Sequence, residues 1–149
     1  MYKIRLSWVV IITLLSVHFT VQATALNNIS ISHTHIRASI PGTVHSSAYM
    51  RINNNSDKKV TLVKVSSNIS PRIEMHNHVM NDDMMSMQQL QSIEINANSQ
   101  VIFQPHGLHL MVFNLTESLK AKDIIEITLH FSNNHRVTVP FPVKSLKQI

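Results

Sequence analysis

Apolar and polar residues alternate along most of this chain, and this period of two limits the fold more than any other feature of the sequence. The alternation is clearest in Ile124–Phe131 and Arg136–Pro142, which flank the turn-type residues Ser132-Asn133-Asn134. Strands that bury one face have this pattern, and Ser and Asn favour the turn between two such strands. We therefore expect these two stretches to form an antiparallel hairpin.

Turn-type clusters recur about every eight to twelve residues along the rest of the chain, a spacing typical of all-β sandwiches and barrels. No stretch demands a long helix, and no shift in composition marks a domain boundary. The sequence therefore predicts one antiparallel all-β domain, either a sandwich or a barrel. Its other expected strands are Ile29–His33, Ser46–Ile52, Val60–Val65, Arg72–His78, Met85–Leu90, Val101–Gln104 and Leu108–Asn114.

The first 23 residues have the pattern of a secretory signal peptide. Lys3 and Arg5 precede the apolar stretch Leu6–Val17, and a small-residue pattern ends at Ala23. An uncleaved membrane anchor is the alternative, but about 12 apolar residues fall short of the roughly 20 that span a bilayer. We therefore expect a signal peptide at 1–23 and a mature domain at 24–149. This domain is expected to be exported, monomeric and without a membrane span.

The sequence contains no cysteine, so a soft metal can bind only through histidine and methionine. Zinc knuckles, iron–sulfur clusters and His₂Cys blue-copper sites are excluded for the same reason. Basic side chains are scattered and aromatic residues make up only 5% of the chain, so we expect no nucleic-acid binding. Gly42 and Gly107 are the only glycines, and no phosphate-cradling loop or nucleophile elbow is present, so we expect no enzyme activity.

Methionine and histidine are concentrated in one part of the chain. Six of the seven methionines that follow Met1 fall within residues 75–111, together with four histidines. A single methionine is more often a core residue than a ligand, because its flexible side chain fills gaps. The clustering needs a further explanation. The residues concerned are Met75, Met80, Met84, Met85, Met87 and Met111, with His76, His78, His106 and His109.

The alternation of side chains separates core positions from candidate ligands. In Leu108–Phe113 the apolar residues Leu108, Leu110 and Val112 share one face, so His109 and Met111 point to the other. In Arg72–His78 the same rule places the histidines opposite the apolar residues. Three strands can therefore present four donors toward a common point, namely His76, Met87, His109 and Met111.

Thioether sulfur and imidazole together favour Cu(I). A thioether is neutral and polarizable, so it binds hard Mg²⁺ or Ca²⁺ poorly and selects Cu(I). Two methionines and two neutral histidines add no negative charge, whereas Cu(II) prefers nitrogen and oxygen donors. Methionine also suits an oxidising compartment, in which paired cysteines are lost to disulfides. We therefore expect one bound Cu(I).

The candidate ligands match a known spacing. Ten residues separate His76 from Met87, twenty-one separate Met87 from His109, and one separates His109 from Met111. This spacing resembles the H-x10-M-x21-H-x-M signature of periplasmic copper(I) chaperones of the PCuAC type. The resemblance extends over about residues 29–139.

The resemblance implies a cupredoxin-like antiparallel Greek-key β-sandwich that carries Cu(I) in the periplasm. It also implies delivery of the ion to the Cu(A) domain of cytochrome c oxidase subunit II, directly or through its assembly factors. His106 departs from the family pattern, because a glycine usually stands at its position in the turn. The sequence offers His78, Met80 and His106 as auxiliary ligands, and His33, His35 and His45 as a weak second site for Cu(II) or Zn²⁺.

Two other functions remain open at this point. A copper storage or resistance protein would use the same site without a defined acceptor. An extracytoplasmic interaction sandwich would contain the Met/His cluster without binding a metal.

Overall fold

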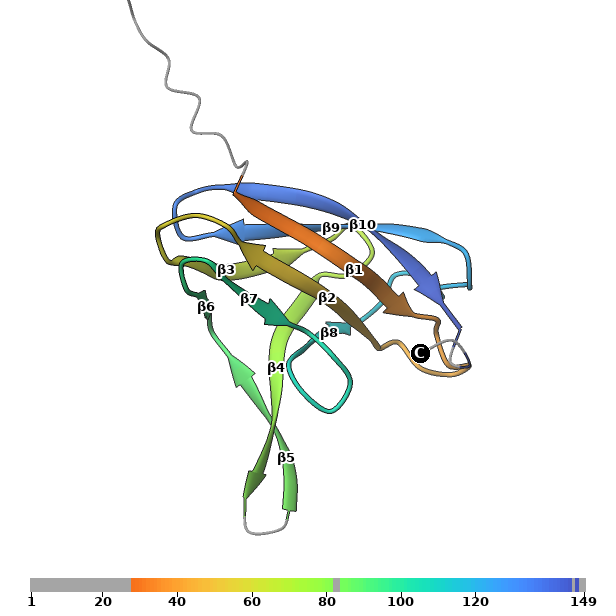
Figure 1. Ribbon diagram of the computed structural model, residues 1–149. Helices are drawn as coiled ribbons and strands as arrows, with labels where there is room; N and C mark the ends of the chain where they lie inside the picture. Colours follow the sequence, from red (N-terminus) through yellow and green to blue (C-terminus); the bar gives the residue numbers. More distant parts are fainter. Residues whose placement is uncertain (1–27, 82–83, 146, 148–149) are drawn as a thin grey trace, which may run out of the picture.

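The computed structural model describes residues 28–81, 84–145 and 147, with only the backbone described at residues 80, 81 and 84. These residues form ten β-strands and no helix (Figure 1). The expected signal peptide at residues 1–23 lies outside the described residues. The strands are β1 (Ile29–Arg37), β2 (Ser46–Asn54), β3 (Val60–Ser66), β4 (Arg72–Asn81), β5 (Met84–Leu90), β6 (Ile93–Ile95), β7 (Ser99–Ile102), β8 (His109–Phe113), β9 (Ile124–Phe131) and β10 (Arg136–Lys144).

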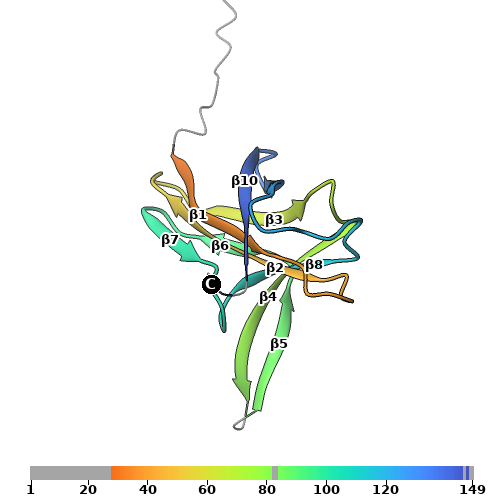
Figure 2. The same cartoon turned by 90° about the vertical axis from the view of Figure 1, so that its right-hand side faces the viewer.

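The strands form a continuous sheet that folds over into two layers (Figures 1 and 2). The first layer has the order β5-β4-β8-β2-β1, with β7 also paired to β2, and the second has the order β10-β9-β3-β6. The layers join where β1 runs parallel to β10, at the pairs Ile36–Val143 and Arg37–Lys144. The remaining strand pairs in the described residues are antiparallel. The predicted all-β sandwich is confirmed.

The hydrophobic core lies between the two layers, because alternate side chains of each strand point inward. Burial of this apolar surface is the main stabilising term for the sandwich. Two methionines belong to the core: Met50 is 1% exposed and Met75 is 6% exposed. The largest apolar side chains that are fully buried are Ile36, Met50, Ile52, Leu62, Ile95, Leu110, Val112, Ile127, Leu129 and Phe141.

The expected C-terminal hairpin is present with nearly the predicted bounds. Strands β9 and β10 pair in an unbroken antiparallel register from Arg136–His130 to Pro142–Ile124. Strand β9 covers Ile124–Phe131, as the alternation predicts. Strand β10 continues two residues past the predicted end at Pro142, to Lys144.

Most other strands differ from their predicted ends by one to three residues, and β7 covers Ser99–Ile102 where Val101–Gln104 was expected. Two larger differences have local reasons. Strand β1 continues to Arg37 instead of ending at His33, because its pairing with β2 resumes at His35 after a bulge between Ser32 and His35. His33 itself has a positive φ of 54°, so the apolar alternation is broken there although the strand continues. Strand β6 was not predicted, since the three residues Ile93–Ile95 are too few to display a period.

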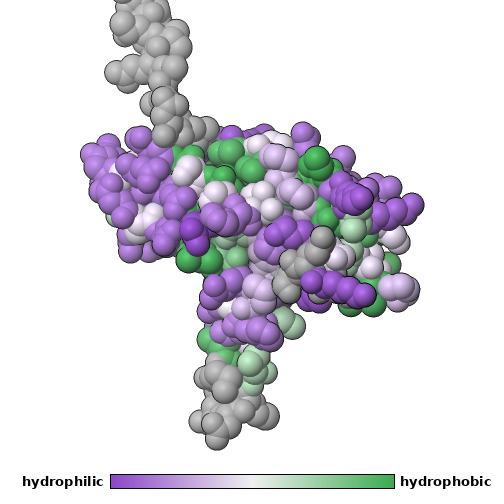
Figure 3. All heavy atoms as spheres, turned by 45° about the vertical axis from the view of Figure 1, so that its right-hand side comes forward, coloured by the Kyte–Doolittle hydropathy of each residue, from purple (hydrophilic) through white to green (hydrophobic). Residues whose placement is uncertain are grey.

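The hairpin of β4 and β5 projects from the sandwich (Figures 1 and 2). Strand β4 pairs with β8 only over residues 72–76, and beyond that point its hydrogen-bonded neighbour is β5. Figure 3 shows hydrophobic and hydrophilic residues side by side on the part of this hairpin that is coloured. Met85 and Met87 of β5 are 58% and 57% exposed. No helix in the described part of the chain is long and apolar enough to cross a membrane.

Candidate metal centre

The register of β4 and β8 brings two predicted ligands directly opposite each other. His76 pairs with His109, and the neighbouring pair joins Glu74 to Met111. Because Met75 pairs with Leu110 inside the core, these four residues lie on the outer face of the same two strands. The rings of His76 and His109 have centroids 6.0 Å apart. The predicted alternation in both strands is therefore confirmed.

The register of β4 and β5 places a methionine beside this face. Met87 pairs with His78, so both side chains lie on the same side of the hairpin. His78 in turn has its ring centroid 5.1 Å from that of His109. Met87 thus extends from the hairpin toward donors that belong to the sandwich.

A cavity of about 280 Å³ lies on this outer face. Three of the four predicted ligands line it, namely Met87, His109 and Met111. His78 and His106, which the sequence offered as auxiliary ligands, also line it. His76 does not line the cavity, although it is the cross-strand partner of His109. The complete lining is Arg37, Ser47, Tyr49, His78, Met87, Pro105, His106, His109 and Met111.

His109 has the environment expected of a neutral metal-binding imidazole. Its side chain is only 4% exposed, although it lies on the face opposite the core. Burial lowers the pKa of His109, the charges of His78 and His76 lower it further, and the hydrogen bond to Gly107 opposes them. The Nδ1–H of His109 donates to the Gly107 carbonyl oxygen at 2.8 Å, since a carbonyl can only accept. The lone pair of the neutral ring is then on Nε2.

His76 has a different partner. Its Nε2 lies 2.8 Å from Oε2 of Glu74. Its Nδ1 is buried and has no hydrogen-bond partner among the described residues. Nε2 of His76 therefore has a hydrogen-bond partner, whereas Nδ1 has none among the described residues.

His78 and His106 surround the same cavity from different elements. Their rings are stacked with centroids 6.1 Å apart. The Nδ1 of His78, like that of His76, is buried without a partner among the described residues. His106 belongs to the turn before β8 and has a positive φ of 60°, a conformation that glycine adopts more easily. The positive φ explains why a glycine is expected at this position, yet this chain has a histidine there.

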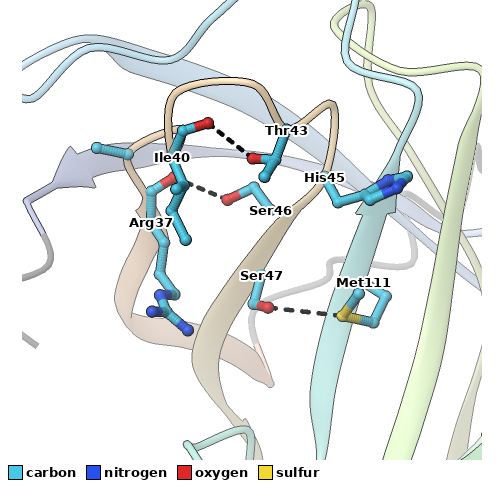
Figure 4. A pocket seen from close by; sticks show the side chains of 8 residues that line it. Arg37, Ile40, Thr43, His45, Ser46, Ser47 and Met111 are labelled. Atoms are coloured by element: carbon cyan, nitrogen blue, oxygen red, sulfur yellow. Dashed lines mark hydrogen bonds between the residues drawn. The ribbon is translucent and has the colours of Figure 1, made fainter.

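Met111 is held by a neighbouring strand. The hydroxyl of Ser47 donates to the Met111 sulfur at 3.5 Å, and Figure 4 shows the two side chains pointing toward each other. Ser47 and Met111 pair across β2 and β8. They also line a second cavity of about 180 Å³, together with Arg37 at the end of β1 and with Ile40 and other residues of the β1–β2 connection (Figure 4). Met111 therefore lies between two adjoining cavities.

The remaining candidate ligands have other surroundings. His35 contacts Tyr49, with ring centroids 5.1 Å apart, and its Nδ1 lies 3.2 Å from the His33 carbonyl oxygen. His45 instead contacts Phe113 edge to face at 5.4 Å. Among the described residues, the suggested second site of His33, His35 and His45 does not form a group of side chains that could hold a metal ion. The side chain of Met80 lies outside the described residues.

Sequence reasoning missed three residues of the cavity that come from the first two strands. These are Arg37, Ser47 and Tyr49. Their polar or aromatic side chains alternate with core residues of β1 and β2, so the period of two already placed them on the outer face. What the sequence lacked was the strand order that sets β2 beside β8. Among the described residues, no three His, Asp or Glu side chains are arranged to hold a metal ion by themselves.

Comparison with protein families gives one match that covers most of the chain. The profile of a family described as "Putative lipoprotein LpqE-like" matches residues 29–143. A curated relative, "Putative lipoprotein Lxx21020" of Leifsonia xyli subsp. xyli, is 26% identical over 119 residues. The match covers 79% of this chain and 70% of that protein.

Solved structures with the same fold include PCuAC domains. The copper-bound PCuAC domain from PmoF2 matches with a TM-score of 0.69 and 23% identity, over 81% of this chain and 96% of that domain. The solution structure of CuI-DR1885 from Deinococcus radiodurans matches with a TM-score of 0.62 and 25% identity, over 82% of this chain and 81% of that protein. The predicted cupredoxin-like sandwich is thus the fold of PCuAC domains.

Proposed function

The chain belongs to the LpqE-like family, and from this premise and the outer-face cavity we propose that it is an exported copper chaperone that binds one Cu(I). One observation carries the proposal: the thioethers of Met87 and Met111 line the same cavity as the imidazole of His109. Sulfur and neutral nitrogen donors select a soft monovalent ion, and no carboxylate is found among the described residues that line the cavity. Two solved proteins of this fold are named as copper-bound and CuI-bound, which supports the same choice.

We propose His76, Met87, His109 and Met111 as the ligands, with His78, Met80 and His106 as auxiliary donors. The unpartnered Nδ1 of His76 supports its inclusion, because a buried polar atom without a partner is rare and needs an explanation. The unpartnered Nδ1 of His78 and its place on the cavity wall make it the natural residue to receive copper during exchange.

Partial exposure of the site fits a carrier that must also release its cargo. Met87 is more than half exposed, whereas His109 is almost fully buried. An incoming ligand can therefore reach the ion from the side of the hairpin without unfolding the sandwich. We propose that the acceptor is the Cu(A) site of cytochrome c oxidase, reached directly or through an assembly factor, and that residues 1–23 direct export to the periplasm.

Anaerobic competition with a Cu(I) chelator tests the binding step. We expect one Cu(I) per chain, and X-ray absorption of the loaded protein should contain two sulfur and two nitrogen scatterers. A shell without sulfur, or no binding at all, would reject the proposal. Incubation of the loaded protein with an apo Cu(A) domain tests delivery, and retention of the copper would indicate a storage protein instead.

A further inference from the structure

Glu74 and His76 form a close pair beside the candidate site. They are two residues apart on β4 and therefore share its outer face. Their side chains are 19% and 13% exposed, so the contact of 2.8 Å is largely shielded from water. The ionic partner of Glu74 on its other side is Arg72, whose Nε lies 3.5 Å from Oε1.

This contact determines which nitrogen of His76 carries the proton. An ionised carboxylate has only acceptor atoms, so Nε2 of His76 must be the donor. In a neutral imidazole the lone pair is then on Nδ1. This atom is buried and has no partner among the described residues, so a proton there would be an unsatisfied donor.

We propose that Glu74 is a positioning residue that fixes the Nε2–H form of His76 and thereby makes Nδ1 the ligand atom. Resting on the function proposed above, this inference names a residue outside the ligand set. A carboxylate that accepts the second N–H of a metal-bound histidine orients the ring and raises its basicity. Glu74 has that relation to His76.

The two cross-strand histidines consequently offer different nitrogens. His109 donates Nδ1–H to the Gly107 carbonyl and has its lone pair on Nε2. His76 donates Nε2–H to Glu74 and has its lone pair on Nδ1. The two rings pair directly across β4 and β8, so the two available nitrogens come from neighbouring strands of the same outer face.

Arg72 stabilises the carboxylate in this arrangement. Its guanidinium lies over the ring of Phe113 at 4.2 Å and also contacts Glu74. Arg72 pairs with Phe113 across the strands, so the cation is held on the same outer face. The pair is partly exposed, so its main effect is to orient the carboxylate rather than to stabilise the fold.

Nitrogen-15 NMR of the metal-free protein tests the proton position without any copper. With histidine ring nitrogens labelled, long-range proton–nitrogen correlations distinguish the two neutral forms. We expect His76 to carry its proton on Nε2, with a protected N–H signal that disappears in Glu74→Ala and persists in the control Glu94→Ala. Glu94 is a suitable control because its carboxylate pairs with Lys59 on an exposed part of the second layer. A proton on Nδ1 of His76 in the wild-type protein would overturn the inference.

Competition with a Cu(I) chelator and NMR spectra of the copper-loaded protein complete the test. Removal of a group that supports a metal ligand costs about tenfold to a hundredfold in affinity, so we expect this loss in Glu74→Ala and none in Glu94→Ala. Glu74→Gln keeps the shape and a neutral acceptor and should recover part of the affinity. Copper bound through Nε2 of His76 would reject the inference and leave the chaperone proposal intact. Absence of Cu(I) binding in the wild-type protein would reject the chaperone proposal and the ligand role of Nδ1 with it, whatever the proton position.

Discussion

The inner and outer faces of β4 and β8 differ completely although they belong to the same short strands. On the inner face, Met75 pairs with Leu110 and both are buried in the core. On the outer face, the adjacent pairs join His76 to His109 and Glu74 to Met111. Methionine occurs on both faces, so its position in the alternation, and not the residue type, separates a packing role from a proposed ligand role.

His130 and His109 differ in what surrounds the ring, although neither is fully exposed. His130 of β9, like His109 of β8, has a pKa lowered mainly by burial. The Nε2 of His130, however, is hydrogen-bonded to the Ser66 hydroxyl at 2.8 Å. Among the described residues no hydrogen bond to Nε2 of His109 is found, and His109 lines a cavity together with two methionines. A lowered pKa alone therefore does not identify a site; the donors around the ring do.

Replacing one methionine on each face should give opposite results. Met75→Ala leaves a cavity in the core, so we expect the free energy of unfolding to fall by about 2–5 kcal/mol with little change in Cu(I) affinity. Met111→Ala should lower the free energy of unfolding by about 1 kcal/mol or less and weaken Cu(I) binding at least about tenfold. Urea denaturation and chelator competition measure the two quantities. Equal effects of both substitutions on copper binding would contradict the division of the faces.

Replacing one histidine on each layer sharpens the comparison. We expect His109→Ala to weaken Cu(I) binding by about tenfold to a hundredfold, because a ligand is lost. His130→Ala removes a ring that is already hydrogen-bonded to Ser66, far from the candidate ligands in the strand order, and should leave the affinity unchanged. Chelator competition on both variants is sufficient. A loss of affinity in His130→Ala as large as in His109→Ala would disprove the assignment of the site to the first layer.

The smallest expected effect concerns pH, where both layers should behave alike. Burial lowers the pKa of His35, His109 and His130 in the folded chain, so below the ordinary pKa of about 6.5 the unfolded chain binds more protons. Stability is then fully present above about pH 6.5 and is lost as pH falls through the lowered values. Urea denaturation of the metal-free protein should give a lower free energy of unfolding at pH 5.5 than at pH 7.5, with a smaller difference in His130→Gln. A higher stability at pH 5.5 would show that the sign is wrong.

The sequence was sufficient for much of the fold because most strands bury one face. The alternation in Ile124–Phe131 marks β9 without error, since this strand lies in the second layer with one apolar side. It fails where the backbone departs from regular geometry, as at the His33 bulge. It also fails for Ile93–Ile95, because three alternating residues are too few to mark a strand, although pairing with β3 and burial of both isoleucines hold it in place.

Of the candidate site, the sequence predicted only which side chains share a face within one strand. Alternation placed His109 and Met111 on one face without knowledge of their neighbours. The contacts of Glu74 with His76 and of Ser47 with Met111 depend on side-chain conformation and strand order, which no local pattern contains. That His78 and not His76 lines the cavity likewise depends on the three-dimensional arrangement of the strands, which the sequence pattern does not contain.

In the projecting hairpin, the side of β5 on which the Met87 sulfur lies depends on the number of residues between Met87 and Leu90. At its base, Leu90 packs against the core and pairs with Met75, which anchors the ladder. A single residue inserted between Met87 and Leu90 would reverse the facing of every side chain farther out along β5. The thioether would then point away from His109 with its chemistry unchanged. Copper affinity would therefore depend on the number of residues between Met87 and Leu90 as much as on the identity of the ligand.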